Sequence, residues 1–523
     1  MQRHNASLRI GLASALALGL VAAGFEANAQ VPPVQPAAGA AAPLPPAPLP
    51  PPPGVEPLPA PSDAATQRLD QELTPRTGGL KSADVARKAE MSSPDVRAKQ
   101  MQVTAAAARV DQAVVSYFPR LGFNARFVQM SPITLPTLGN VVGAQAPGPI
   151  FAACNPVTNQ CTVTNAAAVP LSFTSVNHMY ALQGTLAIPL SDYLLRITQN
   201  HRSASTSESA ARLTEAATRL KVQRDARVAY YNWIRARGAI VVAEQGLETV
   251  KGHLKDVSSA LQVGTASRAD QMRVESQLAA MELAVERAKN LAVLAEEQLR
   301  VMMHDPPGTR YEIGESITAA GPAPSDAELS RLMQEATAAR LEPRALEETA
   351  RSVRLTRKVL QAGYLPRVDG FANLYHQNPN TRYFPQQDVW HTTWDVGVQL
   401  SWTVNDSFTA NSQVAEVEAK AAEIDAQANL VRDAIRMEVT QAYNAVREAQ
   451  TALGTSARQI LAAQESLRVR RELFRNGRAT SAEYTDAETD LIRSQLDLLN
   501  ARVDAKIGQV ALDHAVGRDV QGR

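Results

Sequence analysis

The side chains that most often carry chemistry in proteins form no catalytic grouping along this chain. Its eight histidines are scattered, and we find no H-E-x-x-H motif, no glycine-rich phosphate loop and no nucleophile elbow. The two cysteines, Cys154 and Cys161, lie in a stretch rich in Pro, Gly, Asn and Thr and lack further metal ligands nearby. In an exported protein such a pair favours a small disulfide loop, with free thiols as the alternative. The sequence therefore predicts no enzyme, no cofactor and no metal site.

Acidic side chains recur instead in one motif that occurs twice. The copies begin at Gly264 and Gly477 and follow the pattern G-x-A-[ST]-x-A-[DE]-x-x-x-[AV]-E-[ST]-x-L at a constant offset of 213 residues. Glycine tolerates the left-handed conformation that ends a helix, and Ser or Thr can cap the next one. We therefore predict a turn between two helices at each glycine. Two unrelated hairpins are the alternative, but the agreement over fifteen positions indicates an internal repeat.

The N-terminus indicates export. Residues 1–29 carry Arg3 and Arg9, then an apolar run, and end in Ala27–Ala29, which fits the small-x-small rule for signal-peptide cleavage. A membrane anchor is the alternative, but the apolar run is too short to span a bilayer. Residues 30–65 are rich in Pro and Ala, which predicts a disordered leader, either a spacer or a segment without a specific partner. Without residues 1–29 the acidic and basic residues are equal in number, so no basic excess indicates nucleic-acid binding.

The rest of the chain divides into two halves with the same predicted order of elements. Each half has an opening helix, two strands, a very long helix and a return helix, in that order. In the first half we predict these elements at 94–116, 121–127, 180–190, 192–262 and 266–303. In the second half we predict them at 343–361, 368–376, 394–404, 406–474 and 479–516. Each long helix would form a rod of about 100 Å. Residues 304–342 lie between the halves, and we expect them to form a belt around the middle of the rods.

Alternating apolar and polar residues mark the strands, most clearly at 394–404. This pattern is typical of membrane β-barrel strands, and a half-buried strand of a soluble sandwich is the alternative. The loops at 131–176 and 377–391 would lie on the outer side of the barrel. Four strands cannot close a barrel, and lipid does not tolerate an open sheet edge. Several copies of the chain must therefore contribute strands to one barrel.

With these parts, residues 66 to 517 resemble the TolC-like outer-membrane efflux protein family in layout, in both hairpin motifs and in the Tyr-x-Pro-Arg turns at Tyr117 and Tyr364. The resemblance implies a mixed α and β fold, a homotrimer with four strands per chain and twelve in total, and a long α-helical periplasmic barrel. It also implies an exit duct that serves an inner-membrane transporter through a periplasmic adaptor protein.

The same resemblance assigns roles to the hairpins. Glu483 and Asp486 match the two acidic constriction residues of the family, which would form carboxylate rings at the periplasmic entrance; a solvated acidic face is the alternative. Asp270 matches an aspartate that holds the entrance closed through an Arg and a Tyr. Here those two positions carry Ala479 and Phe474. Two nearby arginines are the candidate substitutes in this latch: Arg475 and Arg478.

Aromatic residues near the strand ends are candidates for anchoring the barrel at the lipid interfaces, with ordinary packing as the alternative. They are Tyr117, Phe118, Trp390, Trp394 and Trp402.

We thus expect a signal peptide (1–29), a leader (30–65), a first efflux repeat (66–303), an equatorial insertion (304–342), a second repeat (343–517) and a tail (518–523). The expected function is passive conduction across the periplasm and the outer membrane of a Gram-negative bacterium, in a tripartite efflux or type I secretion system. A soluble periplasmic coiled-coil adaptor or scaffold is the alternative. No motif identifies the cargo or the inner-membrane pump.

Overall fold

The computed structural model describes residues 64–133, 140–144, 147, 149–170, 176–317 and 328–521. The predicted signal peptide and nearly all of the predicted leader lie outside the described residues. The described chain falls within one compact unit, Pro61–Arg523.

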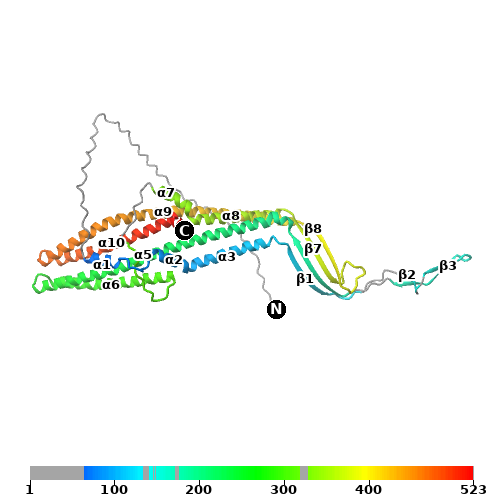
Figure 1. Ribbon diagram of the computed structural model, residues 1–523, viewed down its shortest axis with the longest axis horizontal. Coiled ribbons are helices and arrows are strands. Elements are labelled where there is room, and N and C mark those ends of the chain that lie inside the picture. The colour runs from blue at the N-terminus through cyan, green and yellow to red at the C-terminus, as the bar shows by residue number, and fades with distance from the viewer. Residues whose placement is uncertain are drawn as a thin grey trace, which may run out of the picture. The chain divides into compact units, whose positions relative to one another are not determined.

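Helices make up most of this unit (Figure 1). Their bounds are α1 Ala64–Glu72, α2 Ser82–Ser92, α3 Pro94–Val115, α4 Leu190–Asp192, the π-helix η1 Tyr193–Ile197, α5 Thr198–Gln262, α6 Arg268–Met303, α7 Glu328–Ala339, α8 Leu341–Gln361, the 3-10 turn η2 Ala362–Tyr364, α9 Val404–Arg475, α10 Ser481–Val516 and α11 Arg518–Gln521. The strands are β1 Arg120–Gln129, β2 Asn140–Ala144, β3 Phe151–Asn155, β4 Gln160–Thr164, β5 Ala166–Pro170, β6 His178–Ile188, β7 Arg367–Asn378 and β8 His391–Ser401.

The four longer strands form one antiparallel sheet in the order β1-β6-β7-β8, so β1 and β8 are its edges. Its register pairs Phe123 with Gly184 and Ala372 with Val396. The last strand begins and ends three residues before the predicted range 394–404. Its start is earlier because His391 to Thr393 pair with β7, and its end is earlier because α9 begins at Val404.

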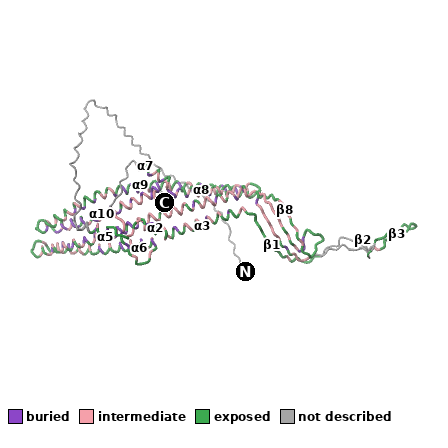
Figure 2. Tube along the Cα trace, viewed as in Figure 1, coloured by how far each residue is buried: buried purple, intermediate pink, exposed green. Residues whose placement is uncertain are grey.

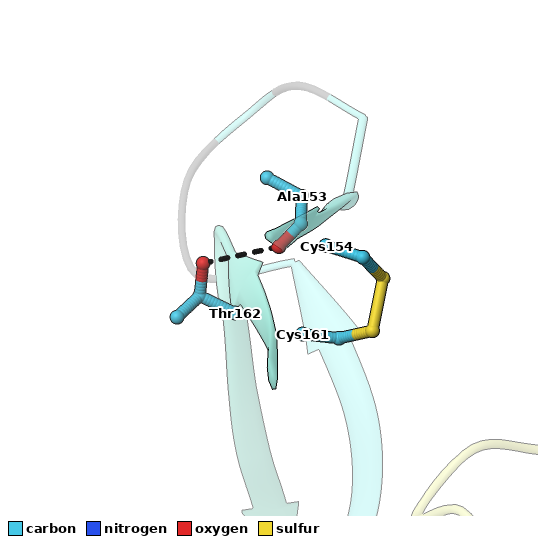
Figure 3. Close-up of a disulfide and its surroundings, with 4 residues drawn as sticks. All are labelled: Ala153, Cys154, Cys161 and Thr162. Atoms are coloured by element: carbon cyan, nitrogen blue, oxygen red, sulfur yellow. Dashed lines mark hydrogen bonds between the residues drawn. A yellow bond between two sulfur atoms is a disulfide. The ribbon is translucent and has the colours of Figure 1, made fainter. Parts of the chain in front are cut away.

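The segment expected to be one long loop, 131–176, contains further strands. Within it β2 pairs with β5, and β3 pairs with β4. The sequence did not predict these pairs because each strand has only five residues and lies among turn-forming residues, which give little strand signal. Cys154 and Cys161 face each other across the β3–β4 pair and form a disulfide, beside a hydrogen bond from Thr162 Oγ1 to the Ala153 carbonyl (Figure 3).

The helices pack lengthwise. α5 packs against α6 and α10, α9 against α10, and α3 and α8 lie along the remaining length of α5. The end of α6 lies beside the end of α2, just before α3 begins, where Ser92 Oγ donates to the Met302 carbonyl at 3.4 Å. The end of α10 lies beside the start of α8, where Arg340 Nη1 donates to the His514 carbonyl at 3.1 Å. The two long helices α5 and α9 are thus each accompanied by shorter helices placed end to end.

The buried residues follow the helices, whereas the edge strands β1 and β8 carry mainly exposed ones (Figure 2). The largest core cluster centres on Trp233 of α5, with Tyr230 and Tyr311 at ring-centroid distances of 5.8 and 6.3 Å. Residues 304–317 of the predicted insertion cross the segment before α2, where Leu80 and Ile313 form a parallel bridge. Its other described part, α7, packs instead against α9 and α10.

Among the helices of the described chain, none combines the length and the apolar character that a membrane-spanning helix requires.

Candidate functional site

The two turns that join the long helices to their return helices are built alike. After α5, Gly264 has φ 78°, and after α9, Gly477 has φ 67°. In this left-handed region a Cβ would be strained, so glycine is the suitable residue at both positions. Ser267 and Thr480 then cap α6 and α10.

Both caps are capping boxes closed by an acidic side chain. In the first, Ser267 Oγ accepts from the Asp270 amide at 3.2 Å, and Asp270 Oδ2 accepts from the Ser267 amide at 3.0 Å. In the second, Thr480 Oγ1 accepts from the Glu483 amide at 3.3 Å, and Glu483 Oε2 accepts from the Thr480 amide at 3.1 Å. The hydrogen bonds from the Ser267 side chain and amide lower the pKa of Asp270 below its ordinary value.

The predicted constriction residues lie on the exposed side of α10. Glu483 and Asp486 are both exposed, while Ser481, Tyr484 and Ala487 on the opposite side are buried. Glu483 also pairs with Arg470 Nη1 of α9 at 3.1 Å. One chain thus presents two carboxylates one turn apart, and the carboxylate ring, which needs three copies, stays a prediction.

Two of the three predicted latch residues, Asp270 and Arg475, have other side-chain partners within the chain, whereas Arg478 is held through its amide, which donates to the Leu473 carbonyl at 2.8 Å. Arg475 Nη2 lies 3.1 Å from Asp256 Oδ1 of α5, and Arg471 Nε lies 3.4 Å from the other oxygen of the same carboxylate. The hydrogen bond to Asp256 raises the pKa of Arg475. Asp270 is engaged by its own capping box, so the structure does not bring Arg475 to Asp270 within one chain.

A buried polar group behind the second turn was missed by the sequence analysis. His253 of α5 and Glu488 of α10 are completely buried, and His253 Nδ1 lies 2.9 Å from Glu488 Oε2. Burial raises the pKa of Glu488, an effect that the hydrogen bond with His253 opposes. Burial likewise raises the pKa of the neighbouring Tyr484. The repeated motif contained Glu488, but nothing local in the sequence indicated a partner 235 residues away.

The candidate interface aromatics lie near both ends of the sheet. Tyr117 accepts a hydrogen bond at its carbonyl from Tyr193 Oη at 3.0 Å, and the ring of Trp390 lies 4.7 Å from that of His376. Three others are largely exposed in the chain, as an interfacial role requires: Phe118, Trp394 and Trp402. Anchoring in lipid stays a prediction for all five.

Comparisons with known proteins agree with this architecture. Residues 332–518 match the family model for outer membrane efflux proteins. The outer-membrane channel OprN has the same fold at 18% identity and a TM-score of 0.65, covering 86% of this chain and 95% of that chain. The outer membrane channel CmeC of Campylobacter jejuni matches at 13% identity, TM-score 0.64, covering 85% of this chain and 89% of that chain. The open state of the Neisseria gonorrhoeae outer membrane channel MtrE matches at 14% identity, TM-score 0.63, covering 83% of this chain and 88% of that chain. None of the curated protein sequences compared with the chain matches it significantly.

Proposed function

Because residues 332–518 match the outer membrane efflux protein family and the chain has the fold of TolC-like channels, we propose that this protein is the outer-membrane exit duct of a tripartite efflux or type I secretion system. It conducts substrates passively from an inner-membrane transporter across the periplasm and the outer membrane of a Gram-negative bacterium. A periplasmic adaptor protein links it to that transporter.

The observation that carries this proposal is the sheet with two open edges. β1 and β8 each pair on one side only within the described chain. Unpaired backbone groups cost several kcal/mol each in lipid, so an open edge must pair with another strand. In a homotrimer, β8 of one copy meets β1 of the next, and twelve strands close the barrel.

The two faces of the sheet support placement in lipid. Trp394, Val396 and Val398 of β8 are exposed on one face. On the other face Asn373 Nδ2 donates to Asp395 Oδ1 at 2.7 Å. An apolar outer face around a polar interior is the pattern of a membrane barrel. The exposed apolar face disfavours the soluble adaptor, which would have to cover it.

The helices also leave apolar surface for neighbouring copies. On α6, Leu291, Leu294 and Val301 are exposed, and on α9 so are Leu430 and Met437. These helices lie at opposite edges of the helical layer, because α5 and α10 pack between them over the part of the bundle near the turns. A trimer would join the two edges and build the periplasmic barrel.

We also propose that residues 66–303 and 343–517 act as two repeats around the equatorial insertion 304–342. The capping boxes at the constant offset support this division. The turns after α5 and α9 then form the periplasmic entrance, lined by Glu483 and Asp486.

The test is single-channel recording on the purified oligomer in planar bilayers, compared with a Glu483→Ala/Asp486→Ala variant. We expect cation-selective steps from the wild type and reduced selectivity in the variant. Steps of unchanged selectivity would remove the entrance assignment. A protein that extracts without detergent and forms no channel would refute the duct itself.

A further inference from the structure

Two residues near the end of α5 hold two different helices of the second half of the chain. His253 contacts Glu488 of α10, and Asp256, one turn later, pairs with Arg471 and Arg475 of α9. The ion pairs of Asp256 contribute little individually because their arginines are exposed and solvent screens them. The contact between His253 and Glu488 is different because both side chains are completely buried.

His253 is enclosed by residues of the second hairpin. Its Nδ1 lies 2.9 Å from Glu488 Oε2, and its Nε2 lies 3.3 Å from Ser481 Oγ. The centroid of its ring lies 3.9 Å from the ring centroid of Tyr484 and 5.8 Å from that of Phe474. Both ring nitrogens therefore bind α10, at its first residue and two turns further on.

Within the two hairpins, which the structure describes in full, this contact occurs once, although the acidic residue occurs in both motif copies. Glu275 is the equivalent of Glu488 in the first hairpin, but it is only partly buried and accepts from Gln271 Nε2 at 2.9 Å on its own helix. The residue 213 positions after His253 is Ser466, which cannot replace an imidazole. The His253–Glu488 contact is thus specific to the junction where α5 meets α10.

The contact is buried but incompletely satisfied. The second carboxylate oxygen of Glu488, Oε1, is buried without a hydrogen-bond partner among the described residues. Titratable groups facing it come from each packed helix: His253 and Asp256 of α5, and Arg471 of α9. A buried carboxylate is costly unless its hydrogen bonds are made, so the contact with His253 stabilises Glu488 in this position, and weakening the contact favours exposure of Glu488 to water.

We propose that His253 and Glu488 are positioning residues that hold α10 against α5 and keep the entrance narrow, and that their separation accompanies its widening. This inference rests on the proposed function. Glu483 and Asp486 lie on the same first turns of α10, on the side away from His253. Because a helix turns as a rigid unit, rotation of α10 that breaks the buried contact also moves both carboxylates.

The experiment compares Glu488→Gln, His253→Gln and the double variant with wild type by single-channel recording. Glu488→Gln keeps the shape of the side chain but removes its charge. We expect an increase of about tenfold in open probability, which corresponds to about 1.4 kcal/mol. The double variant should add little to either single change, because the two residues act through one contact.

The matched control is Glu315→Gln, which removes another hydrogen-bonded carboxylate far along the chain from the turns. Glu315 accepts from Ser82 Oγ at 2.5 Å and from Tyr231 Oη at 2.7 Å. This variant should lower thermal stability and leave open probability unchanged. If Glu488→Gln conducts like wild type, or if Glu315→Gln raises open probability equally, the positioning role is refuted while the duct stands. A wild type without channels would refute both.

Discussion

Glu483 has one observed role and one predicted role, and a single substitution separates them. Its carboxylate closes the capping box of α10 and is also a predicted charge at the entrance. Thr480→Ala removes the cap hydroxyl, which accepts from the Glu483 amide at 3.3 Å, but leaves the charge in place. Glu483→Ala removes the charge and the second hydrogen bond of the capping box, which the carboxylate accepts from the Thr480 amide. Asp486→Ala removes a charge that takes no part in the cap.

The magnitudes follow from these contacts. Loss of a Thr N-cap costs about 1 kcal/mol, so amides in the first turn of α10 should exchange hydrogen about fivefold faster in Thr480→Ala. The ion pair between Glu483 and Arg470 adds little because both side chains are about half exposed. A carboxylate about 5 Å from a passing ion contributes roughly 0.8 kcal/mol even at the dielectric constant of water, a bias of about fourfold towards cations.

The assay is hydrogen exchange of α10 combined with reversal potentials under a salt gradient. Thr480→Ala should change exchange alone, Asp486→Ala selectivity alone, and Glu483→Ala both. If Thr480→Ala reduces cation selectivity as much as Glu483→Ala does, the geometry of the cap controls selectivity and our electrostatic reasoning is wrong.

Three further predictions concern the middle of the helical layer. Trp233→Ala should lower the free energy of unfolding by about 3–5 kcal/mol in denaturant titrations, because the side chain is completely buried. Gly314→Ala should make the crossing segments more sensitive to limited proteolysis, because a Cβ would lie 2.1 Å from the Gly79 carbonyl oxygen. Burial opposes ionisation of Glu315, but hydrogen bonds, chiefly from Ser82, lower the pKa of its carboxyl overall. A carboxyl whose pKa is lowered by folding stabilises the fold at pH values above its ordinary pKa, and this stabilisation is lost as the pH falls through its pKa in the folded state. Glu315→Gln should therefore lower Tm at pH 7 and much less in acid.

Their controls are equally specific. Gly454→Ala on α9 meets no atom within 4 Å and should not increase proteolysis. If Trp233→Ala lowered the free energy of unfolding by less than about 1 kcal/mol, the surrounding rings would have closed the cavity that the substitution leaves. A Tm difference for Glu315→Gln that is equal at both pH values would show that the carboxylate charge contributes nothing.

Local signals accounted for most of the secondary structure. The return helices begin at Arg268 and Ser481, within two residues of the predicted starts, because Gly, Ser and Thr mark these ends by backbone geometry and capping. The strands of the sheet were recognisable because alternation of apolar and polar residues follows from the pleat. The pairs β2–β5 and β3–β4 were missed, since five-residue strands carry too little periodicity.

The sequence by itself determined the long helices, the turns between them, the alternating strands and the resemblance to the outer-membrane efflux family. Each of these depends on residues that are neighbours along the chain. Only the tertiary structure decided that Arg475 binds Asp256 and that His253 binds Glu488. The partners in these contacts are more than 200 residues apart and meet because α10 packs against both α5 and α9. Hydrophobic periodicity does not specify which polar groups face each other across such a packed layer.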